Sequence, residues 1–220
     1  MKTTLTRNSF LSARRACALT LCLALATPLA SASTLLRLTI DELTAQAEIV
    51  FQGEVIAVQA QRSGGRGLVS TFVTFSVSEV IKGSAANGEL ELKFLGGTLD
   101  GEVLEVNGSR LPRLGERGIY FVESVTEDLI NPLLGWSQGQ YLISAIGGSE
   151  QVTTVDARPV IAVVPAGSPS PAPLSSSGRR LSPLQIADDP TAASGIITTQ
   201  NDEGGISPDS FKARLKTLLP

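Results

Sequence analysis

The stretch Ala47–Gly83, AEIVFQGEVIAVQAQRSGGRGLVSTFVTFSVSEVIKG, contains two extended apolar runs on either side of a glycine-rich segment. The second run alternates polar residues with apolar ones of a single parity, namely Val69, Val73, Phe75, Val77 and Ile81. A period of two is typical of a strand with one face against a core and one face in water. Three glycines in segment 63–67 permit a tight reversal, so the stretch predicts a long β-hairpin.

The first run of this hairpin is less regular than the second. Gly53 interrupts it, which is typical of a bend or a β-bulge. After Gly53, Ile56 and Val58 add apolar side chains on the other face, so we expect this part of the strand to pass between two layers. A phosphate-binding loop is the alternative reading of segment 63–67, but no helix N-terminus follows it, and a plain turn is favoured.

Further short strands follow the hairpin. They are expected at Leu90–Phe94, Glu102–Val106, Ile119–Val122 and Tyr141–Ile146, with Val152–Val155 and Val160–Val164 as a last hairpin whose membership of the same barrel stays open. Almost no helical period separates these runs. The sequence therefore predicts a mainly β fold, a small OB-like Greek-key β-barrel over residues 33–164.

Two helices are expected at the ends of the folded region. Thr39 and Glu42 have the spacing of a capping box, which predicts a short helix in front of the hairpin. Over residues 206–220, Ser207 fits an N-cap before Pro208, and the apolar residues that follow at helical spacing predict an amphipathic terminal helix. Residues 165–205 are rich in proline and serine near their start and poor in large apolar groups, which predicts a disordered linker.

The first 32 residues have the pattern of a secretory signal peptide. Basic residues precede the apolar segment 16–26, and Ala30-Ser31-Ala32 supplies small residues for cleavage before Ser33. The apolar segment is short for a membrane span. We therefore expect an exported protein, in the periplasm or the medium, with no membrane span after cleavage.

The composition of the mature chain excludes several classes of chemistry. Cleavage leaves 14 basic and 21 acidic residues, a net charge of −7, so nucleic acid is a poor candidate partner. Both cysteines, Cys17 and Cys22, lie in the signal segment, and the chain has no histidine. Catalysis that needs histidine or cysteine is thus excluded, as are zinc sites built on these ligands, and no cofactor or metal is implied.

Three segments together resemble a known family of domains. Ala47–Val55, Val73–Gly83 and Leu114–Val122 are similar to strands of the netrin-type OB-fold domain, the barrel of the tissue inhibitors of metalloproteinases. Thr39–Ile146 also resembles a widespread group of uncharacterised exported bacterial proteins. The resemblance implies a five-stranded Greek-key barrel that binds proteins. The inhibitors use an N-terminal cysteine fixed by a disulfide, which this chain lacks, so their inhibitory residues do not carry over.

These observations favour an exported, non-enzymatic binding module whose partner is an exported protein, either a metalloprotease or a component of the cell envelope. A protease inhibitor that acts through the N-terminal segment or the loop 110–116 is the alternative. The candidate binding residues are Ser33, Arg66, Arg110, Arg113, Trp136 and Tyr141. A lone tryptophan is more often part of a core than of a binding platform, and both interpretations of Trp136 stay open.

A carboxylate-based enzyme, such as a glycoside hydrolase, is a second alternative. Its acid and base would come from Glu54, Glu79, Glu89, Glu91, Glu102 and Glu105. These residues occur where solvated strand faces need charge, and a small barrel offers little cleft, so we favour the solvated reading. Asp188-Asp189 and Asp202-Glu203 lack the ligand spacing of a calcium loop and are likewise predicted to be solvated charge.

Overall fold

The computed structural model describes residues 36–65, 67–85, 88–168, 186–187, 189–200 and 204–219, which belong to one compact unit. This unit is mainly β with two α-helices, as the sequence predicts. None of the described helices is long and apolar enough to cross a lipid bilayer. The predicted signal peptide, residues 1–32, lies outside the described residues.

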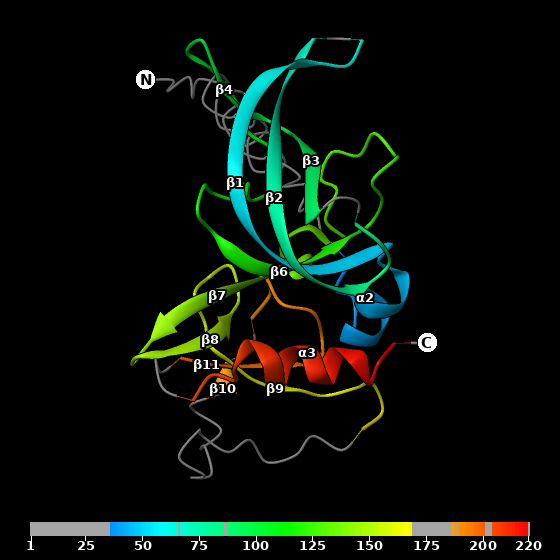
Figure 1. Cartoon of the computed structure of the whole chain (residues 1–220), viewed down its shortest axis with the longest axis vertical. Helices are drawn as coiled ribbons and strands as arrows, with labels where there is room; N and C mark the ends of the chain where they lie inside the picture. The colour runs from blue at the N-terminus through cyan, green and yellow to red at the C-terminus, as the bar shows by residue number, and fades with distance from the viewer. Residues whose placement is uncertain are drawn as a thin grey trace, which may run out of the picture. The chain divides into compact units, whose positions relative to one another are not determined.

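A six-stranded antiparallel sheet forms the centre of the unit (Figure 1). Its strands are β1 (Ile49–Ser63), β2 (Leu68–Lys82), β3 (Glu89–Leu95), β6 (Arg117–Val122), β7 (Gln140–Ile146) and β8 (Ser149–Thr153), in the order β3-β2-β1-β6-β7-β8. The long hairpin β1–β2 confirms the prediction from Ala47–Gly83. β1 pairs with β2 along nearly its whole length but with β6 only through Ile49–Glu54.

Two smaller sheets complete the fold. β4 (Gly97–Leu99) pairs with β5 (Glu102–Leu104), and β9 (Val160–Val163), β10 (Ile186–Ala187) and β11 (Ile196–Thr199) form a sheet in the order β10-β11-β9. The predicted last hairpin is therefore divided, because β8 belongs to the large sheet and β9 to the small one.

The sheets do not close, and the predicted Greek-key barrel is not confirmed. Only isolated contacts connect the outer edge of β3 to β6. The Leu95 N–H donates to the Ile130 carbonyl at 2.8 Å, and Leu133 forms a single bridge with Val122. Pro132 lies in this connecting segment and has no N–H to donate, so the segment cannot continue as a full strand of the ladder.

The predicted irregularity at Gly53 is confirmed. The β1–β2 register shifts between Gln52 and Gly53, and again between Val55 and Ala57. A Cβ atom at position 53 would lie 2.7 Å from the carbonyl oxygen of Ser76, which is closer than real contacts allow. Only glycine therefore permits β2 to approach β1 at this bend.

The large sheet separates two hydrophobic cores. The aromatic core consists of Ile49, Phe51, Val55, Val73, Phe75, Leu92, Phe94, Tyr120, Val122 and Leu133. The rings of Phe51, Phe75 and Tyr120 contact one another with centroid distances between 4.7 and 5.3 Å. Because side chains alternate along a strand, β6 supplies both cores: Tyr120 packs in this one, whereas Phe121 packs in the other.

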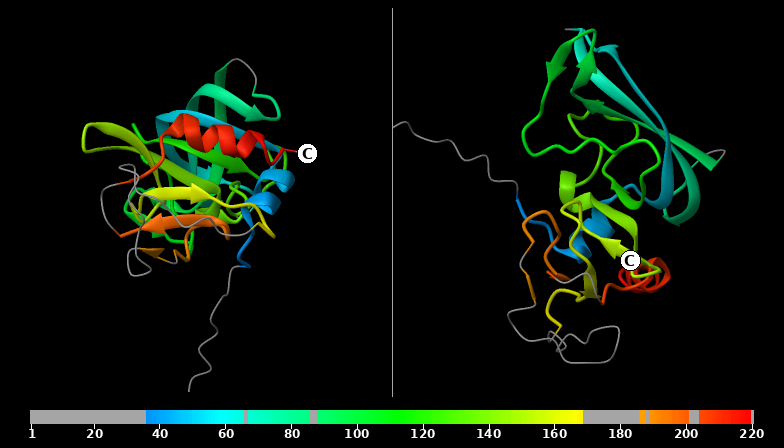
Figure 2. Two further views of the ribbon diagram at one scale, coloured as in Figure 1. Left: turned by 90° about the horizontal axis from the view of Figure 1, so that it is seen from below. Right: turned by 90° about the vertical axis from the view of Figure 1, so that its left-hand side faces the viewer.

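The second, helix-covered core lies on the opposite face of the sheet. Its residues are Ile40, Leu43, Ala47, Val50, Ile81, Ile119, Phe121, Leu134, Tyr141, Val152, Val160, Ala192, Ala193, Ile196, Phe211 and Leu215. The helices α2 (Ile40–Gln46) and α3 (Pro208–Lys216) cover it together with β9 and β11 (Figure 2). Its residues come from both ends of the unit, from the first helix to the last, whereas β3, β4 and β5 contribute none of them.

The caps of both helices form as predicted. The Glu42 N–H donates to Thr39 Oγ1 at 3.1 Å, and the Thr39 N–H donates to Glu42 Oε2 at 2.8 Å, which completes the capping box of α2. The Ser210 N–H donates to Ser207 Oγ at 3.2 Å at the start of α3, where Pro208 occupies the first turn. These caps satisfy amides that a helix N-terminus otherwise leaves unpaired.

The prediction that β1 passes between two layers at Ile56 and Val58 was wrong. Ile56 is 44% exposed, and Val58 is exposed as well. Instead, the strand has apolar side chains on both faces before Gly53, where Val50 packs in the helix-covered core and Phe51 in the aromatic core. The reason is that β6 begins at Arg117 opposite Glu54. Beyond Glu54, β1 is no longer paired with β6 and leaves the part of the sheet that has a core on each face.

The predicted linker, residues 165–205, was wrong for segment 189–200. Ala192, Ala193 and Ile196 are buried in the helix-covered core, and β11 lies between β9 and β10. The small residues of this segment let its backbone approach closely, since a Cβ at Gly195 would lie 2.4 Å from the Val164 carbonyl oxygen. Composition alone reads such small residues as linker, although here they allow close packing.

Asp189 also differs from its prediction as solvated charge. Its carboxylate is buried and accepts hydrogen bonds from Thr154 Oγ1 at 2.6 Å, from the Thr191 N–H at 2.9 Å and from Thr191 Oγ1 at 2.6 Å. A buried carboxylate is stable only when its lone pairs are satisfied in this way. Asp189 thereby fastens the C-terminal segment to the loop after β8. The neighbouring pair Asp202-Glu203 lies outside the described residues.

Candidate binding surface

The hairpin β4–β5 forms one wall of an open hollow. Asp100 and Gly101 make its tip, and both have positive φ angles, of 51° and 83°. This conformation is the one that a two-residue hairpin turn requires. The Asp-Gly pair was a signal for this hairpin that the sequence analysis missed, and the predicted strand 102–106 is correspondingly shorter, ending at Leu104.

Two glycines hold this hairpin close to the far end of β1–β2. The Gly96 N–H donates to the Val69 carbonyl at 2.9 Å, and Thr71 Oγ1 donates to the Gly96 carbonyl at 2.7 Å. A Cβ at Gly97 would lie only 2.2 Å from Thr71 Oγ1. The Arg62 guanidinium adds an ion pair with Glu102 at 2.7 Å. Backbone and side-chain contacts together therefore fix the position of β4–β5.

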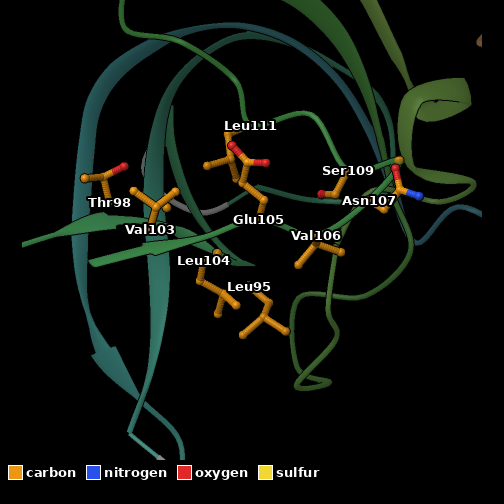
Figure 3. Close-up of a pocket in the computed structure, with 12 residues that line it drawn as sticks. Leu95, Thr98, Val103, Leu104, Glu105, Val106, Asn107, Ser109 and Leu111 are labelled. Atoms are coloured by element: carbon orange, nitrogen blue, oxygen red, sulfur yellow. The ribbon is translucent and has the colours of Figure 1, made fainter. Parts of the chain in front are cut away.

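The hollow lies between this hairpin and the loop 105–111, with a volume of about 620 Å³ (Figure 3). Its apolar lining comes from Leu95, Val103, Leu104, Val106 and Leu111, and its polar lining from Thr98, Glu105, Asn107 and Ser109. Glu105 is the one ionisable side chain of this lining. Val103 is 60% exposed, a large fraction for an aliphatic side chain. The hollow thus offers apolar contact with polar groups around it.

The loop that forms the other wall is anchored at two places. A turn with Gly108 at a φ of 82° brings the Ser109 N–H to 3.0 Å from the Val106 carbonyl. The buried Asn131 then donates from Nδ2 to Ser109 Oγ at 3.0 Å and accepts from the Leu133 N–H at 2.9 Å. These bonds hold the wall in one conformation.

The second anchor is a polar cluster around Glu116. Arg110 donates to both carboxylate oxygens, at 3.0 and 2.5 Å, and Gln140 Nε2 donates to Oε1 at 2.6 Å. Such a bidentate pair is stronger than a single charged hydrogen bond. Burial, and secondarily the charge of Glu116, raises the pKa of the neighbouring Tyr120 phenol. Arg110 thereby holds the loop 110–116 in place, and its role in binding a partner stays a prediction.

Two of the other predicted binding residues, Arg113 and Trp136, lie in the described part of the chain. Arg113 is exposed in the loop 110–116, and Trp136 is half-buried at the start of the 3₁₀ helix η2 (Trp136–Gly139) with a φ of 59°. Ser33 and Arg66 lie outside the described residues.

The prediction that Tyr141 binds a partner was wrong. Its side chain is fully buried, because Tyr141 is paired with Ile119 and shares the face of the sheet that α2 and α3 cover. Its ring centroid lies 5.1 Å from that of Phe211, and its Oη accepts a hydrogen bond from the Ala193 N–H at 3.2 Å. Tyr141 is a structural residue of the helix-covered core.

The predicted carboxylates do not form a catalytic pair across the hollow. Glu79 is bound to Lys212 and Lys216, and Glu102 is bound to Arg62. Glu54, Glu89 and Glu91 are exposed on strands. A smaller hollow of about 220 Å³ is lined by Glu91, Glu127 and Asp128, of which Asp128 is paired with Lys93. Within the described ranges, no group of three or more acidic, histidine or cysteine side chains has the arrangement of a metal site.

Comparison with protein-family models, with curated proteins and with solved structures finds no match to this chain. The resemblance of the three strand segments to the netrin-type domain therefore stays a prediction from the sequence.

Proposed function

We propose that this protein is an exported, non-enzymatic module that binds a protein partner through the hollow between β4–β5 and the loop 105–111. The observation that carries the proposal is the exposure of Val103, 60%, at the mouth of a hollow lined by four further aliphatic side chains. Singly exposed aliphatic residues are ordinary, but several around one concave surface are typical of a binding site.

The character of the lining supports a protein as the ligand. Interfaces between proteins usually have an apolar centre and a polar rim, and an aliphatic or aromatic side chain of one partner often fills a hollow of the other. Here Leu104, Val106 and Leu111 supply the apolar centre, whereas Asn107 and Ser109 lie among the polar residues around it. We therefore expect a partner that inserts an apolar side chain beside Val103.

The rigidity of the walls supports binding as well. The Asn131–Ser109 bond fixes one side of the hollow, and the Arg110–Glu116 pair fixes the loop that follows it. Gly96 and Gly97 fix the hairpin on the other side. A surface that is already ordered loses little conformational entropy when a partner binds, which favours affinity.

Catalysis is the less supported role. A single carboxylate, Glu105, is the one ionisable group of the lining, whereas acid–base hydrolysis of a glycoside requires two carboxylates across a cleft. The residues after position 32 contain no histidine and no cysteine, which removes the common alternatives. We propose export on the basis of the signal-peptide pattern of residues 1–32.

We also propose that the aromatic-core half of the unit is related to the netrin-type OB fold. Support comes from β1, which is bent at Gly53 and pairs with both β2 and β6, the arrangement expected for the first strand of such a barrel. Inhibition of a metalloprotease, the alternative, rests on Ser33, which lies outside the described residues, and on the loop 110–116.

The test is an affinity capture with immobilised mature protein, residues 33–220, exposed to the exported proteins of its own host. Three proteins are compared: the unsubstituted chain, Val103→Asp and Leu114→Asp. Leu114 is 69% exposed and does not line the hollow, so it is the matched control. We expect a captured protein to bind Leu114→Asp normally and to bind Val103→Asp at least about tenfold more weakly, as for a central interface residue.

Other outcomes contradict the proposal. Selective capture that survives Val103→Asp but is lost with Leu114→Asp would move the binding surface to the loop 110–116. If that captured protein is a metalloprotease whose activity falls on binding, the inhibitor function replaces the one proposed here. Absence of any selectively bound protein contradicts a soluble exported partner.

A further inference from the structure

The far half of β1 is an open edge of the large sheet. β6 covers the outer side of β1 only as far as Glu54. The loop before β6 then makes two backbone bonds with Val55, whose N–H donates to the Glu116 carbonyl at 2.9 Å and whose carbonyl accepts from the Gly115 N–H at 2.8 Å. From position 57 to 63, β1 pairs with β2 on one side. Among the described residues, no other backbone hydrogen bond reaches this segment. Its outward N–H and C=O groups are available to another strand.

Other segments of the chain are hydrogen-bonded to the two outer strands of the same sheet, β8 and β3. The Val152 N–H of β8 donates to the Ile206 carbonyl at 3.0 Å, in the segment that leads into α3. The Leu95 N–H of β3 donates to the Ile130 carbonyl at 2.8 Å. Chain segments thus bond to β8 at Val152 and to β3 at its last residue, Leu95, whereas within the described part of the chain no backbone hydrogen bond outside the β1–β2 ladder reaches the far half of β1.

The open edge also lacks the features that usually prevent association between strands. Protected edges carry proline, inward-pointing charges or a bulge in mid-edge. Segment 57–63 contains no proline, and its one charged residue, Arg62, is paired with Glu102 of the same molecule. The bulge of β1 lies between Val55 and Ala57, just before the edge begins. The edge is therefore regular and nearly neutral.

We propose that this edge pairs with the same edge of a second copy of the chain, antiparallel and around a two-fold axis at Ala60. The sequence of the segment is complementary to itself in this register. Ala60 lies opposite Ala60, Gln59 opposite Gln61, and Val58 opposite Arg62. No like charges meet, the residue on the axis is small, and the two glutamine amides can bond to each other.

The same register covers exposed apolar surface at both ends of the edge. Ile56, which is 44% exposed, lies opposite the second copy's Gly64, where no side chain blocks approach. Leu114 is near this point, because the Gly115 N–H donates to the Val55 carbonyl at 2.8 Å. A two-fold contact uses the open edge of each copy once, so it closes as a dimer and does not extend into a fibre.

The dimer is expected to be weak. The edge is short, so the contact area lies at the low end for specific interfaces, and an association in the micromolar range is consistent with that size. The hollow beside Val103 is a different surface, and the proposal does not depend on the function assigned to it.

The experiment is analytical ultracentrifugation of residues 33–220 at low to high micromolar concentrations. Two double variants place like charges on facing positions: Gln59→Lys with Gln61→Lys, and Gln59→Glu with Gln61→Glu. Both glutamines are exposed, so neither variant disturbs a core. The matched control is Ser76→Lys with Ser84→Lys, which adds the charge of the lysine variant at exposed positions away from the edge.

We expect the unsubstituted chain and the control to dimerise alike. Each charged variant alone should dimerise about tenfold more weakly or worse, because two like-charged pairs face each other across the axis. An equal mixture of the two variants should restore the dimer through opposite charges, a result that misfolding cannot produce. A chain that stays monomeric throughout, or charged variants that dimerise as well as the control, would overturn the proposal.

Discussion

The two faces of the large sheet are covered in different ways. The aromatic core is built between residues 49 and 133, mostly from hairpin-connected strands. The helix-covered core extends from Ile40 to Leu215 and requires segments far apart in the sequence. One face is therefore a product of local pairing, whereas the other forms only when the C-terminal third of the chain returns to the sheet.

This difference also separates stability from the proposed function. The helix-covered face is closed by α2, α3 and β11. The hollow beside Val103 and the open edge of β1 both belong to the half that contains the aromatic core, where Leu111 packs partly against that core. The C-terminal segment is thus expected to support the fold without taking part in binding.

The largest effect should come from Phe211→Ala. Phe211 is fully buried although it lies in the last helix. Its loss leaves a cavity beside Tyr141 and should lower the free energy of unfolding by about 3–5 kcal/mol, measured by urea denaturation. Arg214→Ala, at an exposed position of the same helix, should change it by less than about 0.5 kcal/mol. Equal stability of the two variants would show that α3 does not dock on the sheet.

A pair of tyrosine variants compares the two cores directly. Tyr141→Phe removes the acceptor of the Ala193 N–H in the helix-covered core and leaves a buried amide unpaired, which should cost about 1–3 kcal/mol. Tyr120→Phe in the aromatic core removes a long contact, 3.5 Å, to Glu116 and an interaction with the Gln140 side chain, and should cost less than about 1 kcal/mol. Both losses in the free energy of unfolding are measured by chemical denaturation. A larger loss for Tyr120→Phe than for Tyr141→Phe would contradict the hydrogen bonding described.

The smallest effect concerns the ionic contact of α3 with β2. Hydrogen bonds, first from Lys212 and then from Lys216, hold the pKa of Glu79 below its ordinary value. Because the pKa is lowered in the folded state, the stabilisation is present above about pH 4.5 and is lost as pH falls through the lowered pKa. Glu79 is 33% exposed, so Glu79→Gln should cost only about 0.5–1 kcal/mol at pH 7.

The measurement is urea denaturation of the unsubstituted chain and of Glu79→Gln at pH 7 and at pH 3. The difference between their free energies of unfolding should be smaller at pH 3 than at pH 7. Glu89→Gln, which removes an exposed carboxylate on β3, is the control for the loss of one negative charge. A difference for Glu79→Gln that grows as pH falls would have the wrong sign for this contact.

Local patterns in the sequence predict the long hairpin and the first helix well. The alternation from Val69 to Ile81 gives β2, Gly53 gives the bend, and Thr39 with Glu42 gives the first cap. Each of these features depends on residues close together in the chain. Their physical cause, a side-chain period or a backbone conformation, can be read without knowledge of distant partners.

The remainder depends on distant partners. Ala192 and Ala193 are typical of a linker in composition, but in the structure they are buried in the same core as Tyr141 and the apolar residues of α3. From the sequence alone Asp189 resembles a solvated residue, but in the structure its buried carboxylate accepts a hydrogen bond from Thr154. The sequence analysis did not locate the hollow, because its predicted loop 110–116 shares only residues 110–111 with the wall 105–111. It also did not predict the contact of Arg110 with Glu116, because the chain reversal that brings Glu116 to the Arg110 guanidinium is not visible in the residues alone.

Hydrogen exchange of residues 33–220 tests the two-core account most directly. The Ala193 N–H donates to Tyr141 Oη, and the Ser194 N–H donates to the Leu38 carbonyl at 2.7 Å. If segment 189–200 is part of the helix-covered core, these two amides should exchange slowly, with protection similar to that of the β6 amides. Exchange of both at the rate of an unstructured peptide, while β6 stays protected, would contradict the account and return this segment to the predicted linker.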